Sequence, residues 1–215
     1  MRKFFLILTT MIMASCSLED TDNVAIYQDY GVIREDSPTS GKLYIRSDEG
    51  KVILPSQSNF LSNEDRDSRV WLRFSTASDI DSDTIKANVY EFLIVTQMGF
   101  KTQNDESVSD NVYLQSMWVA QDYLTLIMDV AASSDNSLQS HKYTMFLDEE
   151  SVNSIEEVSD TVHLVFKYDR NNDSNTNSYT KIVALKLDDK INAKVLKITY
   201  KTDLGIKEQI VTYKK

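Results

Sequence analysis

The fold class follows from one stretch near the amino terminus, in which Lys42-Leu-Tyr-Ile-Arg46 and Lys51-Val-Ile-Leu-Pro55 flank Ser47-Asp-Glu-Gly50. Both arms are rich in β-branched and aromatic residues, which favour strands. Gly50 can adopt the positive φ that a short hairpin turn needs. The stretch therefore predicts a β-hairpin, and its neighbours extend it.

Strand-like segments lie on both sides of this hairpin. Residues 25–33 form a first candidate strand with a bulge at Gly31, and residues 70–74 and 89–95 supply two more. Five short strands with no helix between them are typical of a small closed barrel of the OB type. We therefore expect an OB-like barrel over residues 24–101.

A second β-rich region follows residues 102–110, a polar segment without periodicity that predicts a linker. Leu196, Ile198 and Tyr200 alternate with polar residues, as in a sheet with one face in water. Residues 111–215 contain seven such runs, 112–119, 123–130, 141–147, 161–168, 179–187, 194–201 and 205–213. We expect an all-β protein in which the barrel precedes a roughly seven-stranded antiparallel β-sandwich, with the two domains folding separately.

The amino terminus has the pattern of an export signal. Arg2-Lys3 precedes an apolar run that ends at Met13 and is too short to span a bilayer, and small residues precede Cys16. This arrangement resembles the bacterial lipoprotein signal, with residues 1–15 as signal peptide, Met13, Ala14 and Ser15 as the lipobox and Cys16 as the lipid attachment site. The alternative is an ordinary cleaved leader beside a free thiol.

Three carboxylates follow this cysteine, Glu19, Asp20 and Asp22, within a predicted acidic tether over residues 16–23. In lipoproteins of the Bacteroidota such a cluster resembles the signal for export to the outer face of the outer membrane. The alternative is a solvated spacer without an address. The two signals predict an outer-membrane, lipid-anchored protein displayed at the cell surface.

Charge limits the partners of the mature chain. Without Arg2 and Lys3 the chain has 21 basic and 33 acidic side chains, so its net charge is −12 with neutral histidines. This excess repels phosphate backbones, and no basic stripe offsets it. We expect no nucleic acid partner, membrane contact through the lipid anchor, and a glycan, peptide or protein ligand.

The order of these parts resembles the NigD-like lipoproteins of Bacteroides and its relatives. The pieces that match are residues 43–50 with Leu54-Pro55, residues 70–72, residues 122–126 and residues 141–147. The resemblance implies an amino-terminal OB domain and a carboxy-terminal β-sandwich. The family often carries an Arg-His pair in the strand found here at residues 165–168, and this chain lacks it. The family's name comes from a gene in a bacteriocin operon, which is an association and not an activity.

Two loops have alternate oxygen ligands. Asp79-Ile-Asp-Ser-Asp83 and Asp169-Arg-Asn-Asn-Asp173 carry the spacing of a calcium loop. Neither has the central glycine, and Tyr90 and Thr180 stand where the bidentate glutamate would be. The alternative is a turn between strands. We predict no metal site.

No catalytic constellation is visible in the sequence. His141 starts a predicted strand, and His163 alternates with apolar neighbours, which predicts a surface position. The chain has no Gly-x-Ser-x-Gly elbow and no phosphate loop. The acidic pairs at residues 149–150 and 156–157 read as solvated carboxylates. We predict no catalytic residue, no cofactor and no enzymatic activity.

Aromatic residues are frequent in the predicted barrel. Some could form a stacking surface on its outer face, although aromatic side chains fill the interior of a barrel this small. The candidates are Tyr27, Tyr30, Tyr44, Trp71, Phe74, Tyr90 and Phe92. Two readings remain: a non-catalytic binding or protective lipoprotein, related to bacteriocins through the family name, and a glycan hydrolase whose carboxylate pair meets only in three dimensions.

Overall fold

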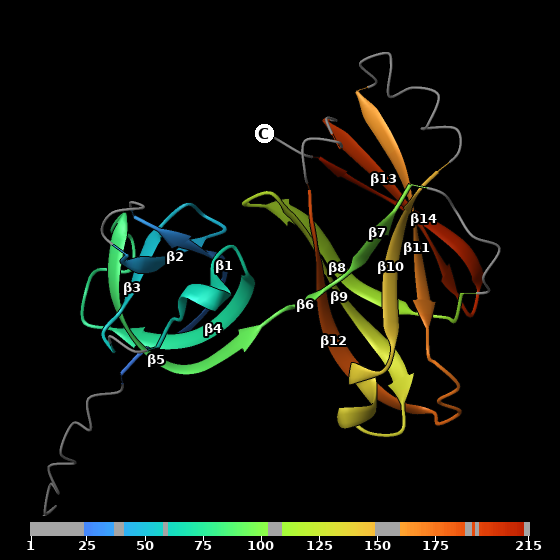
Figure 1. Cartoon of the computed structure of the whole chain (residues 1–215), viewed down its shortest axis with the longest axis horizontal. Helices are drawn as coiled ribbons and strands as arrows, with labels where there is room; N and C mark the ends of the chain where they lie inside the picture. The colour runs from blue at the N-terminus through green and yellow to red at the C-terminus, as the bar shows by residue number, and fades with distance from the viewer. Residues whose placement is uncertain are drawn as a thin grey trace, which may run out of the picture.

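The computed structural model describes residues 24–36, 41–57, 60–102, 109–148, 160–187, 191 and 194–212. These residues form two β domains side by side, a barrel and a sandwich (Figure 1). Two short 3-10 turns, η1 (Asn63–Asp65) and η2 (Asn136–Gln139), join strands. Among the described residues, no helix is both long enough and apolar enough to cross a bilayer. Residues 1–23, which carry the predicted leader, anchor and acidic tether, lie outside the described part.

The barrel closes in the strand order β1-β2-β3-β5-β4. Its strands are β1 (Ile26–Glu35), β2 (Leu43–Ser47), β3 (Val52–Pro55), β4 (Arg69–Thr76) and β5 (Thr84–Ile94). The predicted hairpin is confirmed, since Arg46 lies opposite Val52 and Gly50 has a φ of 88°. Ile33, Ile45, Ile53, Leu72 and Phe74 fill the interior.

The bulge predicted at Gly31 is wrong. Gly31 is paired without interruption to Ser47 on one side and to Val70 on the other. The glycine serves a close approach instead, because a Cβ there would lie 2.5 Å from Cγ2 of Ile45. The register shift lies in the β4–β5 ladder near Arg73 and Phe74.

The sandwich has a five-stranded sheet in the order β14-β13-β11-β10-β7 and a four-stranded sheet in the order β6-β12-β9-β8. The first contains β7 (Gly99–Lys101), β10 (Lys142–Leu147), β11 (Thr161–Asp169), β13 (Val195–Thr202) and β14 (Gly205–Thr212). The second contains β6 (Thr96–Gln97), β8 (Tyr113–Ala120), β9 (Tyr123–Ala132) and β12 (Asn177–Lys186). Leu124, Leu126, Leu164, Phe166 and Ile198 are among the buried residues between the sheets.

The expected barrel followed by a sandwich is confirmed, and the seven predicted sandwich runs correspond to β8 to β14. Two features differ. The short strands β6 and β7, expected within the barrel region 24–101, pair with β12 and β10 and so belong to the sandwich. Three pairings, β6–β12, β7–β10 and β11–β13, are parallel instead of antiparallel. Strands of two or three residues show no periodicity, which is why the sequence did not separate them from β5.

Candidate functional site

The most unusual group of side chains lies where the barrel meets the sandwich, and we call it the junction. Arg69, at the start of β4, is fully buried. Its guanidinium group forms a bidentate ion pair with Asp48 in the β2–β3 turn, with Nη2 and Oδ2 2.6 Å apart. Its Nε donates to Oγ1 of Thr125 on β9, at 3.1 Å. A barrel arginine is therefore bonded to a sandwich strand.

Aromatic rings enclose this ion pair. The guanidinium carbon of Arg69 lies 5.6 Å from the ring centroid of Tyr30 and 5.9 Å from that of Trp118, at cation–π distances. The two rings meet edge to face at 5.0 Å. The indole N–H of Trp118 donates to Oδ2 of Asp48 at 2.6 Å. The carboxylate thus accepts bonds from both domains.

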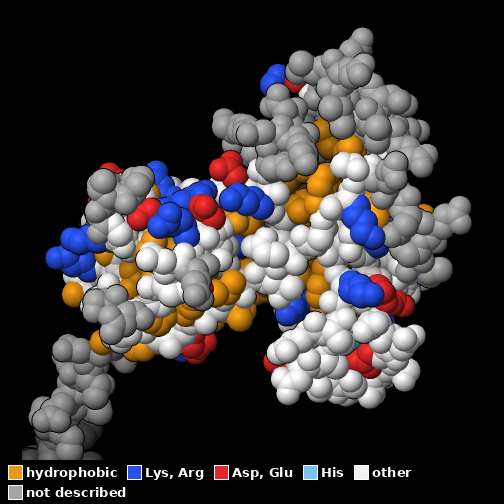
Figure 2. Space-filling view, viewed as in Figure 1, with side chains coloured by type: hydrophobic (Ala, Val, Ile, Leu, Met, Phe, Trp, Pro, Cys, Tyr) orange, Lys and Arg blue, Asp and Glu red, His pale blue; other side chains and the backbone are white. Residues whose placement is uncertain are grey.

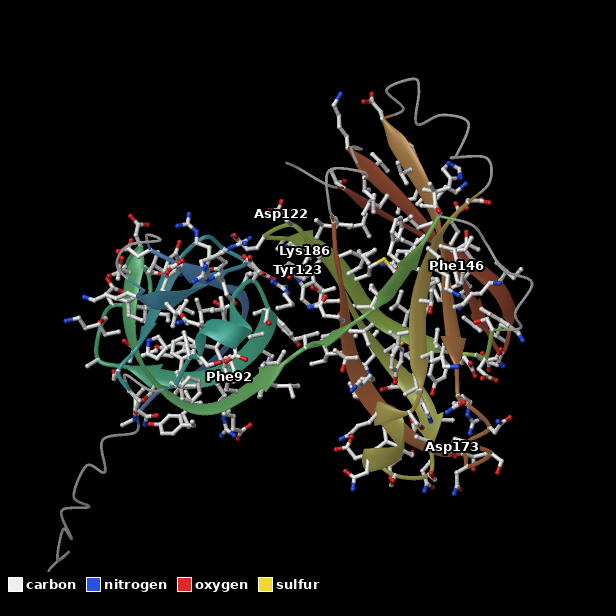
Figure 3. The ribbon with its side chains drawn as sticks, in the orientation of Figure 1. Phe92, Asp122, Tyr123, Phe146, Asp173 and Lys186 are labelled. Atoms are coloured by element: carbon white, nitrogen blue, oxygen red, sulfur yellow. The ribbon has the colours of Figure 1, made fainter. Side chains whose placement is uncertain are left out.

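Apolar packing surrounds this polar centre. Val32 of the barrel, Val95 before β6, and Tyr123 and Ala184 of the sandwich form one buried cluster. Trp71 packs against it. Figure 3 shows Tyr123 at the end of the sandwich that faces the barrel, and its hydroxyl donates to the carbonyl of Asp67. The two domains consequently share a small core of their own.

The turn between β8 and β9 adds polar contacts at the junction's edge. Gln121 and Asp122 both have left-handed backbones, with φ of 50° and 66°. Nε2 of Gln121 donates to the carbonyl of Ser47 at 2.9 Å. Nη2 of Arg34 on β1 lies 3.8 Å from Oδ2 of Asp122 and donates to the carbonyl of Gln121 at 3.5 Å. These contacts bring a sandwich turn against the barrel, which fixes how the two domains sit.

The chemistry of the junction is structural. Arg69 and Asp48 use their charged atoms on each other and on Thr125 and Trp118. Removing one partner of a buried ion pair leaves an uncompensated charge, which costs about 3–5 kcal/mol. The junction therefore holds the two domains in one fixed arrangement.

Asp29, next to Tyr30 on β1, is the one described carboxyl with a strongly raised pKa. Burial raises this pKa to about 6, and the nearby carboxylates of Asp48 and Glu49 add to the effect. The backbone N–H of Tyr30 donates to its Oδ1 at 2.7 Å and works against the shift. Asp29 consequently changes charge within a mildly acidic pH range.

A second buried polar network lies at one end of the sandwich, where Figure 3 marks Asp173. Nδ1 of His141 is 2.7 Å from the hydroxyl of Tyr168, and its Nε2 is 3.3 Å from Oδ2 of Asp173. Ser133 donates its N–H and its hydroxyl to that same carboxylate oxygen, at 2.8 and 2.9 Å. Backbone N–H groups of Ser133 and Asn175 hold the pKa of Asp173 well below its usual value.

This network has the residue types of a proton relay, but its histidine and tyrosine are shielded from solvent. His141 is 6% exposed and Tyr168 is fully buried. Burial raises the pKa of the Tyr168 hydroxyl. Because the histidine ring is enclosed and both of its nitrogens have partners, we interpret the network as a brace between β10, β11 and the loop before β12.

Two open depressions lie on the barrel. One, of about 610 Å³, is lined by residues that include Leu43, Leu54 and Leu61. The other, of about 570 Å³, lies beside Val24, Ser75 and Asn88. No group of three or more His, Cys, Asp or Glu side chains that could hold a metal ion occurs in the described part of the chain.

Residues 94–213, more than half of the chain, match the family described as the NigD-like C-terminal beta sandwich domain. The chain belongs to the NigD-like family. The resemblance seen in the sequence is thereby confirmed. No curated protein matches the chain.

Solved structures from Bacteroides species share the fold of this NigD-like chain. A protein of unknown function from Bacteroides vulgatus has a TM-score of 0.69 at 17% identity, covering 89% of this chain and 92% of that one. A putative lipoprotein from Bacteroides fragilis has a TM-score of 0.64 at 10% identity, covering 89% and 99%. A NigD-like immunity protein from Bacteroides caccae has a TM-score of 0.58 at 17% identity, covering 87% and 92%. None of these descriptions names a catalytic activity.

In the two candidate calcium loops of this NigD-like chain, backbone N–H groups donate to carboxylates of the same loop. The N–H of Asp81 donates to Asp79 at 3.0 Å, and the N–H of Asn171 donates to Asp169 at 2.8 Å. Asp173 is bonded to Ser133 and to the N–H of Asn175. Each of these carboxylates accepts a bond from an amide two residues further along, so both segments contain Asx turns.

The two histidines differ in position: His141 is buried and His163 points outward. His163 lies between the buried Val162 and Leu164 on β11, so its side chain points away from the core as predicted. His141 does precede β10, but its ring is buried and bonded at both nitrogens, which the sequence did not indicate. The acidic pairs at residues 149–150 and 156–157 lie outside the described residues.

Most of the aromatic candidates are packed. Phe74 is buried against Tyr27, and Phe92, labelled in Figure 3, meets Phe60 edge to face. Tyr30 and Trp71 belong to the junction. Tyr90 is 51% exposed, and its hydroxyl lies 2.8 Å from Oγ of Ser75. Of the candidates, Tyr90 is exposed on the outer face of the barrel, and Tyr44, beside the buried Ile45 on β2, is partly exposed.

The sequence missed Arg69, Asp48, Trp118 and Thr125 as a group. Arg69 has only the alternation of an ordinary strand residue, and Thr125 lies 56 positions away from it. The one available signal was a charged residue directly before the apolar run 70–72. The predicted lipobox residues Met13, Ala14 and Ser15, the anchor Cys16, and the acidic residues Glu19, Asp20 and Asp22 all lie outside the described residues.

Proposed function

We propose that this protein is an outer-membrane lipoprotein, anchored through Cys16 and displayed at the cell surface, that acts by binding or protection without catalysis. The leader, the lipobox and the acidic tether in the sequence support this location at the outer membrane and the cell surface. The similarity to a putative lipoprotein from Bacteroides fragilis is consistent with it.

The observation that carries the binding role is the junction. The Arg69–Asp48 ion pair, Trp118 and Thr125 tie the barrel and the sandwich into one body with fixed outer surfaces. A rigid pair of β domains presents a preorganised surface to a partner, which lowers the entropy lost on binding. The polar networks around Arg69 and around His141 brace the fold, which supports a binding role.

The class of partner follows from charge and from the relatives. A mature chain of net charge −12 attracts cationic polypeptides and tolerates neutral glycans. Similar structures are described as a NigD-like immunity protein and as a putative toxin related protein from Parabacteroides distasonis. We therefore propose a bacteriocin-like cationic polypeptide as the first partner to test and a neutral surface glycan as the second.

Two experiments test this proposal. Cys16→Ala should remove incorporation of a palmitate analogue and leave an uncleaved precursor; labelling that persists in the variant would refute the anchor. The soluble chain from Asn23 onward should bind cationic peptides or polysaccharides saturably without forming product. Release of sugars or peptides that a single carboxylate substitution abolishes would instead establish the hydrolase.

A further inference from the structure

An exposed apolar patch lies on the outer face of the barrel, at the edge where the described chain begins. Val24 is 57% exposed, Ile26 50% and Tyr90 51%. Ile26 on β1 pairs with Ser75 on β4, and Ser75 bonds to the Tyr90 hydroxyl, so the side chains of Ile26 and Tyr90 flank the same serine. Val24 lines the depression that also contains Ser75. Val24, Ile26 and Tyr90 form what we call the barrel patch.

The patch continues along β5 toward the sandwich. Leu93, 49% exposed, pairs with Trp71 on the same outer face. Figure 1 shows β5 along the lower side of the barrel, and Figure 2 shows apolar atoms gathered along that lower edge. Single exposed apolar residues need no explanation, but a contiguous group with an aromatic member marks an interaction surface.

The charges beside the patch differ in balance from the rest of the molecule. Arg73 and Glu91 form an ion pair at 2.7 Å, and Lys86 lines the adjoining depression. These three side chains sum to +1, whereas the mature chain, with 21 basic and 33 acidic side chains, carries −12. The described charges that border the barrel patch are therefore close to balanced, so this face does not share the acidic excess of the chain.

The length of chain before the patch limits what lies next to it. Eight peptide steps separate Cys16 from Val24, and a fully extended chain spans at most about 3.6 Å per residue, or roughly 29 Å. A lipid on Cys16 would therefore keep Val24 within that distance of the bilayer. Tyrosine also favours the membrane–water interface, because its ring is apolar and its hydroxyl polar.

We infer that the barrel patch rests on the lipid surface to which the chain is anchored, with Val24, Ile26 and Tyr90 entering the headgroup region. This inference rests on the anchoring proposed above and adds an orientation to it. β14 belongs to the sandwich and not to the barrel that carries the patch, so it serves as the reference surface.

The test supplies the anchor chemically, so that it does not depend on lipidation in the cell. Because Cys16 is the only cysteine, the chain from Cys16 onward can be coupled by its thiol to a maleimide phospholipid in phosphatidylcholine–phosphatidylglycerol vesicles. That chain keeps every residue that the structure describes. Vesicles with brominated acyl chains quench tryptophan only at close range, so quenching reports contact with lipid.

Three proteins are compared: the parent, Ile26→Trp in the patch, and Ile206→Trp on β14, where Ile206 is 78% exposed. Brominated lipid should quench Ile26→Trp beyond the parent, whose Trp71 and Trp118 give the background, and should leave Ile206→Trp at the parent's level. Adding Tyr90→Glu to Ile26→Trp should reduce the extra quenching at least twofold.

Equal quenching of the two tryptophan variants, or none above the parent, would overturn the inference while leaving lipidation at Cys16 untouched. A blue shift of Ile26→Trp emission without quenching would mean that a second copy or another partner covers the patch, and would overturn it as well.

Discussion

The junction and the His141 network are both buried polar groups, and they differ in what they connect. The His141 network links residues of the sandwich to one another, with His141, Tyr168 and Asp173 within 32 positions in the chain. The junction links Asp48 to Trp118, 70 positions away and in the other domain. Similar chemistry therefore braces one fold in the first case and joins two folds in the second.

The difference lies also in the charge that is buried. Arg69 carries a positive charge and is fully buried. The free energy of the fold therefore depends on Asp48, which compensates this charge. The His141 ring needs no charge to keep its two partners, and Asp173 is held by amides at an open turn. We expect the junction to respond far more strongly to the loss of one partner.

The largest expected effect comes from Asp48→Ala, which leaves Arg69 buried without its carboxylate. It should lower the free energy of unfolding by about 3–5 kcal/mol. Urea unfolding followed by tryptophan fluorescence measures this loss, since Trp71 and Trp118 both lie at the junction. The matched control is Arg73→Ala, which breaks an exposed ion pair and should cost less than about 1 kcal/mol. Equal losses for the two variants would contradict the role of the junction.

The next effect is that of Trp118→Phe, which keeps a ring beside Arg69 and removes one N–H donor to Asp48. A hydrogen bond to a charged group contributes about 1.5–3 kcal/mol, and the variant should lose stability in that range. Calorimetry measures the change independently of tryptophan emission. A variant as stable as the parent would show that the indole N–H is dispensable.

A smaller effect is expected for Asp173→Asn in the His141 network. The folded pKa of Asp173 is depressed, so the carboxylate stabilises the fold above its unfolded pKa of about 3.8 and loses that contribution as the pH falls. The variant should be less stable than the parent at pH 7, by less than Trp118→Phe, and the gap should narrow below pH 4. Thermal unfolding across pH 3–7 measures this gap, and one that does not change with pH would contradict the assignment.

The smallest effect, of opposite sign, is that of Asp29→Asn beside the junction. The folded pKa of Asp29 is raised to about 6, so the ionised group opposes folding, and stability is lost as the pH rises through that value. Asn at this position should stabilise the protein at pH 7–8 by about 1–2 kcal/mol, given 1.36 kcal/mol per pKa unit and partial solvation. The gain should vanish near pH 4; urea unfolding at both pH values tests it.

The strands with clear patterns were predictable, because local residue types determine them. The hairpin at Gly50 follows from turn chemistry, and β13 follows from the alternation of Leu196 and Ile198. The strands β6 and β7 were not predictable, since a strand of two or three residues shows no periodicity in sequence. Their pairing is determined by β12 and β10, which lie far away in the chain. A sandwich fragment that begins at residue 110 would lack both.

The junction could not be predicted for a related reason. Its partners lie 21, 56 and 70 positions apart in sequence, so no spacing marks them. The polar segment 102–110 suggested separate folding, because a linker is visible in composition and an interface is not. The structure instead shows shared packing through Val32, Val95 and Tyr123.

The central claim, that the junction makes the two domains one cooperative body, is tested most directly by differential scanning calorimetry of the chain from Cys16 onward. The structure predicts a single transition whose calorimetric and van't Hoff enthalpies agree, and a transition at lower temperature in Asp48→Ala. Two separate transitions in the unaltered chain would contradict the claim.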